Sequence, residues 1–372
     1  MESKRLRPAD RRRVMLADLA REAGVCVSTA SRAMRDLRGV NDRTRETVQR
    51  AARRLNYIPN AHARSLVLGR SDLVAFVTPP IDSETPPDRA AVRVQALVRA
   101  EGKRLIHITH DETGCESIVR TALEQQWTAM VIIPYVQPHV VTEMAQLLRA
   151  SGTHVVTVLN VAPGVDGAGY DRAHGIRLLL DHARSAGVRS VALIGVEPAP
   201  GLMLRHDPKF RNFETDLRAR DMSLTRCISL PLGQPRGPEL YHLAYRHTAR
   251  AWADGLRADY FIGANDTIAV GVLHALIDAG VRVPGDVIVS GYDNHECSVY
   301  ARPPLTTVER PVDDAVELAW SLLRRRIAGE TGEARSVMLQ PRLIVRESTR
   351  RNAPPPDQTS LPLPSPVPLQ VE

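Results

Sequence analysis

Several features that would place the chain in other protein classes are scarce or missing. Aromatic residues make up only 4% of the sequence, and its four cysteines lie far apart with no CxxC pair. This spacing argues against a disulfide framework or a zinc ribbon and favours a reduced, cytoplasmic protein. No run of 18 apolar residues occurs, and the first residues are charged, so we expect neither a membrane span nor a secretory signal.

Sequence signatures of catalysis are missing as well. The chain has no Walker loop, no GxSxG and no HExxH. His107, His110 and Asp111 suggest a metal site or an HD-type hydrolase, but in an extended strand the two histidines would point to opposite faces. No second acidic or histidine cluster accompanies them. We therefore expect a protein that is not an enzyme and that holds no metal or other cofactor.

Positive charge is present in excess, and it is concentrated at one end. Residues 1–70 contain 17 Lys and Arg against 7 Asp and Glu, a net charge of +10, whereas the remaining residues carry a net charge of −3. A length of 372 residues indicates two or three domains. A basic head joined to a mildly acidic body is typical of a nucleic-acid-binding module attached to a second function.

The basic segment contains the pattern of a helix-turn-helix. From Leu16 to Ala23 apolar residues recur at helical spacing, and Gly24 permits the tight turn that ends this helix. A second short helix would bury Ala30 and Ala33, small residues that let two helices cross closely. Its expected outward-facing residues are Val27, Ser28, Ser31, Arg32 and Arg35. This second helix is the one that would enter the major groove of DNA.

A third helix and a short linker follow. The third helix should begin after Asn41, which is a good N-cap, and bury Val48, Ala51, Ala52 and Leu55. The next stretch, LNYIPNAHARSL, contains Pro59 as a helix breaker, Asn60 as a cap and Leu66 at the end of a further short helix. So short a helix is unstable in isolation, and we expect it to fold only when paired across a homodimer on DNA.

At this point the sequence resembles a known family. Residues 14–77, and above all the blocks AGVxxxTxSR and LxYxPNxxARSL, are similar to the head, hinge and first core strand of the lactose repressor and galactose repressor (LacI/GalR) family of bacterial transcription regulators. The similarity continues more loosely through YDRAHGIRLLLDH, FIGANDTIAVGVLHALIDAG and PPLTTVERPV. The resemblance implies a DNA-binding regulator with a periplasmic-binding-protein-like core.

The resemblance also implies roles for residues of the head. Val27 and Ser28 would read bases with Arg32 as a third contact, since arginine can donate two hydrogen bonds to a guanine edge and valine can touch a thymine methyl. The expected phosphate contacts are Thr29, Ser31 and Asn41, with an ordinary surface hydroxyl as the alternative for Ser31. Within the hinge, Asn60 is a further DNA contact.

Leu66 matches the leucine that the family inserts into the minor groove, and an ordinary contact between linker and body is its alternative. Two head positions depart from the family pattern, because Met15 and Cys26 stand where Ser or Thr usually caps the helix. Each lost cap costs about 1 kcal/mol. Cys26 as a redox switch is the less favoured interpretation, since the sequence shows no activating partner for it.

The body alternates short apolar runs with helical stretches near 88–102, 115–127, 171–186 and 266–280, which predicts parallel sheets. The predicted strands are Leu73–Thr78, Leu105–Thr109, Met130–Ile133, Val155–Leu159, Val191–Gly195, Tyr260–Ala264 and Val287–Tyr292. The fold class we expect is an all-α helix-turn-helix head plus an α/β periplasmic-binding-protein-like core of two doubly wound parallel-sheet lobes. The predicted domains are a basic arm at 1–13, the helix-turn-helix domain at 14–58, a hinge at 59–70, a ligand-sensing and dimerisation core of two interleaved lobes at 71–350, and a disordered proline-rich tail at 351–372.

Ligands of such sheets bind outside the carboxyl ends of the strands. Asn265 and Asp293 follow two predicted strands and match family ligand positions, and Lys209 stands where the family has a ligand-binding arginine. Arg205 or Arg211 is the alternative to Lys209. The alternative for these strand-end residues is turn chemistry and helix capping, and it is the favoured interpretation for Asp266, which also follows a strand and opens a helix.

A standard sugar effector is questionable, because the stretch PPIDSETPPDRAAV after Pro79 lacks the aromatic residues with which relatives stack the ligand. The remaining candidates for stacking are Trp127, Tyr135, Tyr170 and Phe213. We predict a cytoplasmic homodimer that represses transcription from a near-palindromic operator in double-stranded DNA under control of a small-molecule effector, a sugar or related metabolite. The alternative is a DNA-binding regulator whose core binds no small molecule and serves as a dimerisation or protein-interaction module.

Overall fold

The structure, a computed structural model, describes residues 14–57, 71–78, 88–109, 115–134, 138–196, 208–230 and 237–351. The chain divides into two compact units, Met1–Asp72 and Leu73–Glu372. The predicted arm, the hinge with Asn60 and Leu66, and the tail beyond residue 351 lie outside the described residues. Among the described residues, no helix is long and apolar enough to cross a membrane.

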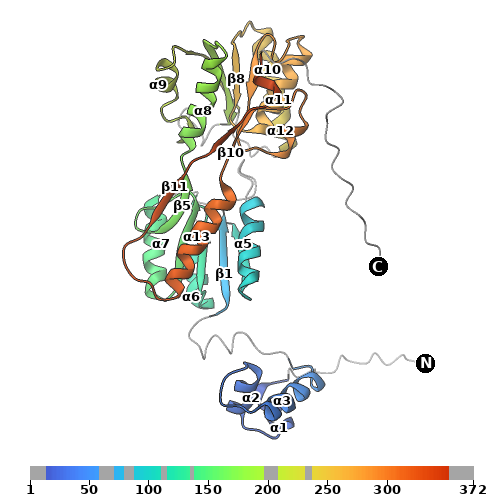
Figure 1. Cartoon of the computed structure of the whole chain (residues 1–372), viewed down its shortest axis with the longest axis vertical. Helices are drawn as coiled ribbons and strands as arrows, with labels where there is room; N and C mark the ends of the chain where they lie inside the picture. The colour runs from blue at the N-terminus through green and yellow to red at the C-terminus, as the bar shows by residue number, and fades with distance from the viewer. Residues whose placement is uncertain are drawn as a thin grey trace, which may run out of the picture. The chain divides into compact units, whose positions relative to one another are not determined.

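The first unit contains the three predicted helices, α1 (Leu16–Glu22), α2 (Val27–Met34) and α3 (Asp42–Arg54) (Figure 1). Gly24 adopts a positive φ of 66° in the turn between α1 and α2, where a side chain would be strained. Small side chains allow the helices to pack closely. The buried core consists of Leu19, Ala20, Ala30, Ala33, Val48, Ala51 and Ala52, which confirms the predicted helix-turn-helix pattern.

In the second unit, the first lobe (here the N-lobe) is built on a six-stranded sheet with the order β11-β5-β4-β3-β1-β2. Every neighbouring pair in it is parallel. The strands are β1 (Leu73–Thr78), β2 (Arg104–Thr109), β3 (Ala129–Ile132), β4 (His154–Leu159), β5 (Asp166–Tyr170) and β11 (Ser336–Leu339). The helices are α5 (Asp88–Ala100), α6 (Cys115–Gln125), α7 (Pro138–Ala150) and α13 (Val312–Ile327).

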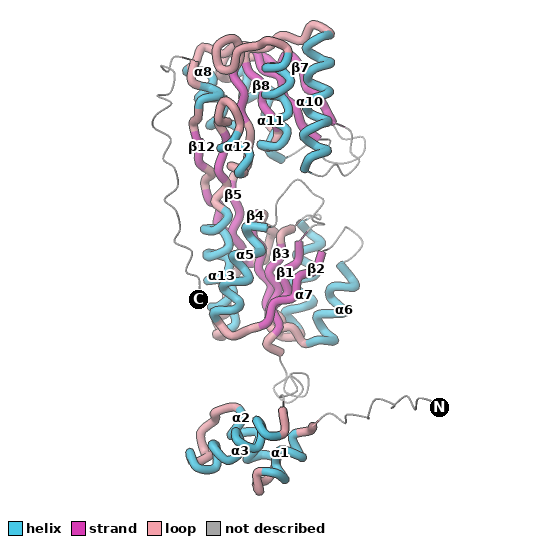
Figure 2. Tube along the Cα trace, turned by 90° about the vertical axis from the view of Figure 1, so that its right-hand side faces the viewer, coloured by secondary structure: helices cyan, strands magenta, loops and turns pink. Residues whose placement is uncertain are grey.

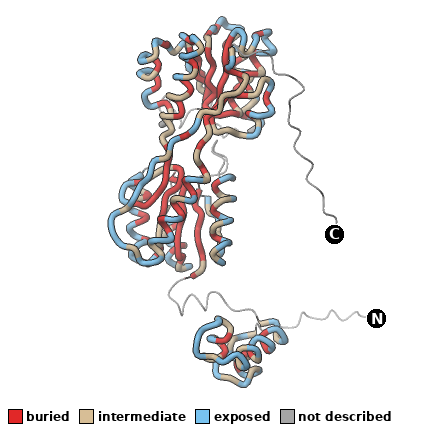
Figure 3. Tube along the Cα trace, viewed as in Figure 1, coloured by how far each residue is buried: buried red, intermediate tan, exposed pale blue. Residues whose placement is uncertain are grey.

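Alternate residues of β1 face opposite sides of this sheet. Val74 and Phe76 belong to the core cluster that contains α5 and α13, whereas Ala75 and Val77 belong to the cluster of α6 and α7. All of β1 is buried, because helices cover both faces (Figures 2 and 3). The N-lobe is therefore a doubly wound sheet, as the strand–helix alternation predicts.

The second lobe (the C-lobe) has a parallel four-stranded sheet with the order β7-β6-β8-β9. Its strands are β6 (Ser190–Val196), β7 (Ser223–Leu230), β8 (Tyr260–Gly263) and β9 (Ile288–Ser290). Figure 1 shows α8 (Arg172–Ser185) and α9 (Phe213–Arg218) on one side of it, and α10 (Gly237–Ala253) and α11 (Asp266–Asp278) on the other. The described part of this lobe also contains a short helix, α12 (Glu296–Tyr300), and the 3-10 turns η2 (Pro208–Phe210) and η3 (Glu347–Thr349).

The chain passes between the lobes at three places. It leaves β5 for α8 at residue 171, returns from β10 (Thr307–Glu309) into α13, and passes from β11 to β12 (Arg342–Ile344). Two of these connections are hydrogen-bonded to each other, because β10 pairs antiparallel with β12. The backbone N–H of Asp171 also donates to the carbonyl of Leu339 at 3.1 Å. The lobes are thus interleaved in sequence.

Several elements were not predicted from the sequence: β5, β7, β10, β11, β12, α7, α9, α10, α12 and α13. The clearest case is β5, whose sequence DGAGY has low β-propensity. Its strand conformation depends on distant partners. The Asp166 carboxylate accepts from the guanidinium of Arg326 and, at 2.7 Å, from the backbone N–H of Arg335. A Cβ on Gly167 would clash with the side chain of Thr157.

Candidate DNA interface and effector site

The second helix of the head presents its predicted base contacts to solvent. Val27 is 47% exposed, and Ser28 and Arg32 are also exposed. The opposite side of α2 buries Ala30 and Ala33 against α1 and α3. An apolar side chain, a hydroxyl and a guanidinium therefore share the outer side of one helix, which is the set of groups that reads base edges in a major groove.

The predicted phosphate contacts have a different environment. Thr29 and Ser31 are half-buried on α2. Asn41 is exposed, but its Oδ1 accepts a hydrogen bond from the backbone N–H of Thr44 at 2.8 Å, which confirms the predicted N-cap of α3. The cap uses only the oxygen of this carboxamide, so the amino group remains available to donate to a phosphate.

Neither Met15 nor Cys26 makes a side-chain cap to the helix that it precedes. At the first helix, Asp18 compensates in part, because its carboxylate accepts from the backbone N–H of Met15 at 2.9 Å. This contact satisfies a donor at the start of α1 that Met15 itself cannot serve.

At the second helix, the Cys26 thiol lies 3.1 Å from the Ser28 hydroxyl and 3.0 Å from the Thr29 hydroxyl. Hydrogen bonds from these two side chains lower the pKa of Cys26 to about 7. The expectation that Cys26 has no activating partner was therefore wrong. Ser28 and Thr29 lie in the first turn of α2, two and three residues after Cys26, so their spacing in the sequence could have indicated these contacts.

In the core, the three predicted effector residues come together at the carboxyl ends of β8 and β9. Lys209 donates from Nζ to the carbonyl of Ala264 at 2.8 Å, next to Asn265 in the chain. The same ammonium lies 5.2 Å from the centre of the Tyr292 ring, next to Asp293. Residues far apart in sequence thus meet where ligands of parallel sheets bind.

Asn265 is engaged inside the protein. Its Oδ1 accepts from the backbone N–H of Ile268 at 2.9 Å, so it is the N-cap of α11, and it is only 2% exposed. The interpretation of Asp266 as the capping residue was therefore wrong, because the cap is the residue before it.

Asp266 has another set of partners. Its carboxylate accepts from the Thr307 hydroxyl at 2.6 Å and from the backbone N–H of His295 at 2.7 Å. Burial raises the pKa of Asp266 to about 8. The carboxyl joins α11, the loop after β9 and the returning strand β10, which makes it a structural link between segments of the C-lobe.

Asp293 forms a buried ion pair that the sequence did not predict. Its Oδ1 lies 2.9 Å from Nε of Arg310, and the two side chains are 8% and 5% exposed. Arg310 follows β10, in the connection that leads back to the N-lobe. Burial lowers the pKa of Arg310, but the interactions with Asp293 and Tyr170 raise this pKa by more than burial lowers it. The guanidinium therefore stays charged.

The loop that carries Asp293 has a strained backbone. Asp293 and Asn294 adopt φ angles of 105° and 52°, which non-glycine residues rarely do. The backbone N–H of Asp293 donates to the carbonyl of Val308 at 2.8 Å, and the Asn294 Oδ1 accepts from Arg346 at 2.7 Å. Such strain persists only where surrounding contacts hold it, and it is common at ligand sites.

Most of the predicted stacking residues are unsuited to that role. Trp127 is 1% exposed in the core of the N-lobe, and Phe213 packs edge-on against Phe210 in the C-lobe. Both are core residues because large apolar side chains stabilise most when buried. Tyr170 is buried at the end of β5, beside Arg172, and Tyr135 lies outside the described residues.

The remaining candidates are the two alternatives to Lys209 and the possible metal ligands. Arg211, an alternative to Lys209, is exposed, and Arg205 lies outside the described residues. His107 bonds to the Thr78 hydroxyl at 2.9 Å and stacks on Phe76, while His110 and Asp111 lie outside the described residues. Within the described ranges, no group of three or more metal-ligating side chains was found.

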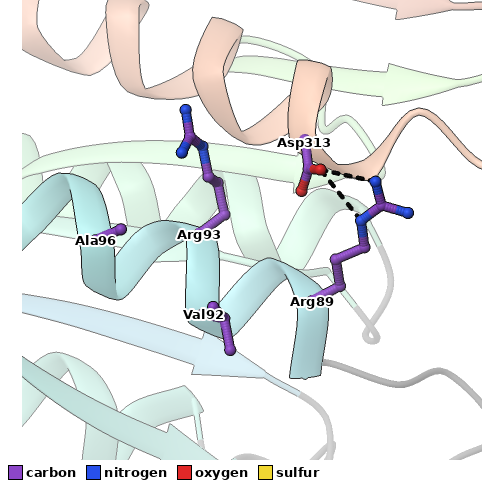
Figure 4. A pocket seen from close by; sticks show the side chains of 5 residues that line it. All are labelled: Arg89, Val92, Arg93, Ala96 and Asp313. Atoms are coloured by element: carbon purple, nitrogen blue, oxygen red, sulfur yellow. Dashed lines mark hydrogen bonds and ion pairs between the residues drawn. The ribbon is translucent and has the colours of Figure 1, made fainter. Parts of the chain in front are cut away.

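The N-lobe also has a pocket of about 460 Å³ along α5 and α13 (Figure 4). Arg89, Val92, Arg93 and Ala96 line it from α5, and Asp313 lines it from α13. Arg89 donates to the Asp313 carboxylate at 2.7 Å, and Arg93 pairs with Glu317 one turn further along. These pairs join the two helices on one face of the N-lobe, and Nη1 of Arg89 also lies 4.0 Å from Oε1 of Glu309.

Comparison with known proteins supports both parts of this architecture. Residues 15–60 match the family model for bacterial regulatory proteins of the lacI family, and residues 180–349 match the periplasmic binding protein-like domain. The ribose operon repressor of Bacillus subtilis (strain 168) is 29% identical over 353 residues, covering 90% of this chain and 98% of the relative. The lactose operon repressor of Escherichia coli (strain K12) is 26% identical over 304 residues, 80% of each chain.

Solved structures share the fold. The lac repressor dimer bound to operator and the anti-inducer ONPF has a TM-score of 0.77 at 22% identity, covering 91% of this chain and 99% of that one. The complex of the transcriptional regulator CelR with cellobiose has a TM-score of 0.60 at 25% identity, covering 90% and 100%. The helix-turn-helix head and the two-lobed core define the class: a DNA-binding transcription regulator with a periplasmic-binding-protein-like core. The chain belongs to the LacI/GalR family of these regulators.

Proposed function

We propose that this regulator is a cytoplasmic homodimer that represses transcription by binding a near-palindromic operator, and that it catalyses no reaction. The exposed set Val27, Ser28 and Arg32 on α2 supports DNA reading most directly. A dimer on operator DNA is what the related lac repressor structure contains. Two copies of α2 related by a two-fold axis would read the two halves of an inverted repeat.

Within each head, Arg32 would bind a guanine edge and Val27 would contact a thymine methyl, with Ser28 beside them. Thr29, Ser31 and the amino group of Asn41 would contact phosphates, which fixes orientation without reading sequence. We further propose that Asn60 and Leu66 contact DNA in the hinge, with Leu66 wedged into the minor groove.

The effector would bind at the carboxyl ends of the core strands, where Lys209, Asn265 and Asp293 meet. A sugar or related metabolite is the class that relatives suggest, because they include a ribose operon repressor and a complex with cellobiose. Effector and operator would then be coupled reciprocally, typically by about 1–3 kcal/mol.

One observation favours the alternative, a core that binds no small molecule. Asn265 and Asp293 each have a partner inside the protein, in the α11 cap and the pair with Arg310. A core whose polar groups are satisfied internally could serve as a dimerisation module alone.

Selection of DNA from a random duplex pool with the full-length chain tests the DNA-binding part. We expect an inverted repeat and two chains per duplex. Equal affinity for all duplexes, or an asymmetric site bound by one chain, would contradict the proposal. Adding a sugar and metabolite panel to the selected duplex then tests effector control, since the alternative predicts no change in operator affinity with any compound.

A further inference from the structure

Two buried tyrosines lie beside cations at the predicted effector site. Tyr170 ends β5 in the N-lobe, and Tyr292 follows β9 in the C-lobe. The guanidinium carbon of Arg172 lies 5.5 Å from the centre of the Tyr170 ring, and Nζ of Lys209 lies 5.2 Å from that of Tyr292. The Tyr292 hydroxyl donates to the carbonyl of Arg172 at 3.1 Å, which places these groups in one cluster.

Arg310 adds a third cation to this cluster. Its Nε lies 2.9 Å from Oδ1 of Asp293, yet this buried Nε makes no hydrogen bond within the described part of the chain. The pair is therefore held by attraction between charges rather than by an aligned hydrogen bond. A guanidinium has five N–H donors in a planar fork, so it can bind a second anion while it stays paired.

Positive charge predominates around the two rings. The described cations there are Arg172, Lys209 and Arg310. Asp293 is the counter-charge of Arg310, whereas burial raises the pKa of Asp266 to about 8, which leaves this carboxyl mainly protonated at pH 7. Glu309 and Arg346, which both contact Asn294, add no net charge.

We propose that the effector carries an anionic group, a carboxylate or a phosphate, that binds Lys209 and Arg310. This inference rests on the proposed effector control. A neutral polyol could bond to the remaining lone pairs of the Asp293 carboxylate, but it would leave the excess positive charge of this cluster unbalanced. An anionic group instead gives Arg310 a second acceptor in a charge-assisted contact, and Asp293 stays in place.

Calorimetric titration of the full-length chain with matched probes tests the inference. The pairs are D-glucose with D-gluconate, and D-ribose with ribose 5-phosphate, and inorganic phosphate is titrated alone. We expect an anionic probe to bind at least about tenfold more tightly than its neutral partner, with an affinity that falls as salt rises. A preference for gluconate indicates a carboxylate, and a preference for the phosphorylated sugar indicates a phosphate.

Variants then assign the contact. Lys209→Gln should weaken the anionic probe about tenfold, whereas Lys209→Arg keeps the charge and most of the affinity. Arg250→Gln removes a cation from an exposed ion pair with Asp254, far along α10, and serves as the control that changes nothing. Arg310→Lys should retain part of the affinity, which separates a charge contact from a loss of folding.

Equal or tighter binding of the neutral probes overturns the inference, and so does an unchanged anion affinity in Lys209→Gln. Operator binding separates this failure from a failure of the proposed function. If a neutral sugar alone shifts operator affinity, effector control stands and the anionic inference falls. If no probe binds and none shifts operator affinity, both fall.

Discussion

The head and the core hold their functional side chains in opposite ways. In the head, Val27, Ser28 and Arg32 project from α2 into solvent, above a small core of alanines. In the core, Asn265 and Asp293 are buried, and each is bound to another part of the protein. The proposed recognition surface is exposed in the chain by itself, whereas the proposed effector residues also hold parts of the C-lobe together.

This difference has an energetic consequence. Substitutions on the outside of α2 should change DNA binding and leave stability nearly unchanged, because exposed positions rarely contribute more than about 0.5 kcal/mol. Substitutions at the effector site should change stability and ligand binding together. Substitutions in both parts of the molecule test this contrast.

Arg310→Met should destabilise the core most, by about 3–5 kcal/mol, because it leaves the buried Asp293 carboxylate unpaired. Urea unfolding of the full-length chain measures this. The double variant Arg310→Met with Asp293→Leu should recover most of the loss, since an apolar pair needs no counter-charge. Arg250→Met is the matched exposed control. A single variant as stable as the control would show that the pair contributes little.

Asp266 should make the stability of the core depend on pH. Its pKa is raised from the usual 3.8 to about 8, so the folded chain binds a proton that the unfolded chain has lost. The contribution of Asp266 to stability should therefore be fully present below about pH 4, fall as pH rises, and level off above pH 8, with a total on the order of a few kcal/mol.

Asp266→Asn should remove this part of the pH dependence. Denaturant unfolding of both proteins at intervals from about pH 5 to 9 gives the difference, which isolates Asp266 from carboxyls such as Asp166 whose pKa is lowered. Parallel curves for the two proteins across this range would show that Asp266 does not titrate there.

Arg32→Ala should weaken binding to the selected operator by about 1–3 kcal/mol and relax specificity at one base pair. Thermal unfolding should remain that of the parent, because the side chain is exposed. Fluorescence anisotropy with single-base operator variants measures the effect. A uniform loss on all DNA would instead make Arg32 a phosphate contact, and a drop in stability would break the contrast between head and core.

Cys26→Ser should stabilise the head by about 1 kcal/mol by restoring a side-chain cap to α2, which thermal unfolding of the two proteins can measure.

The thiols of the chain should also differ in reactivity, because hydrogen bonds lower the pKa of Cys26 to about 7, whereas burial raises the pKa of Cys297 to about 11. At about pH 7.5, iodoacetamide should therefore modify Cys26 well before Cys297, as mass spectrometry of timed samples can show. Equal modification of both thiols would contradict this assignment.

Much of the head could be predicted because its signals are local. Helical spacing of apolar residues, Gly24 in the turn and Asn41 as a cap each act within a few residues, and the structure places all of them as expected. The activated thiol of Cys26 was missed although its partners are also local. In the core, Lys209, Asn265 and Asp293 were identified as a group, but their internal partners were not.

The sequence alone therefore specified which segments form the head and where the strands of the core carry their polar ends. Tertiary structure decided which of those polar groups have partners inside the protein. Arg310 pairs with Asp293, and Arg326 and Arg335 hold Asp166, across separations that no local pattern encodes. The Asp166 contacts join segments that the whole C-lobe separates in the sequence, and a buried ion pair interacts more strongly than one in water.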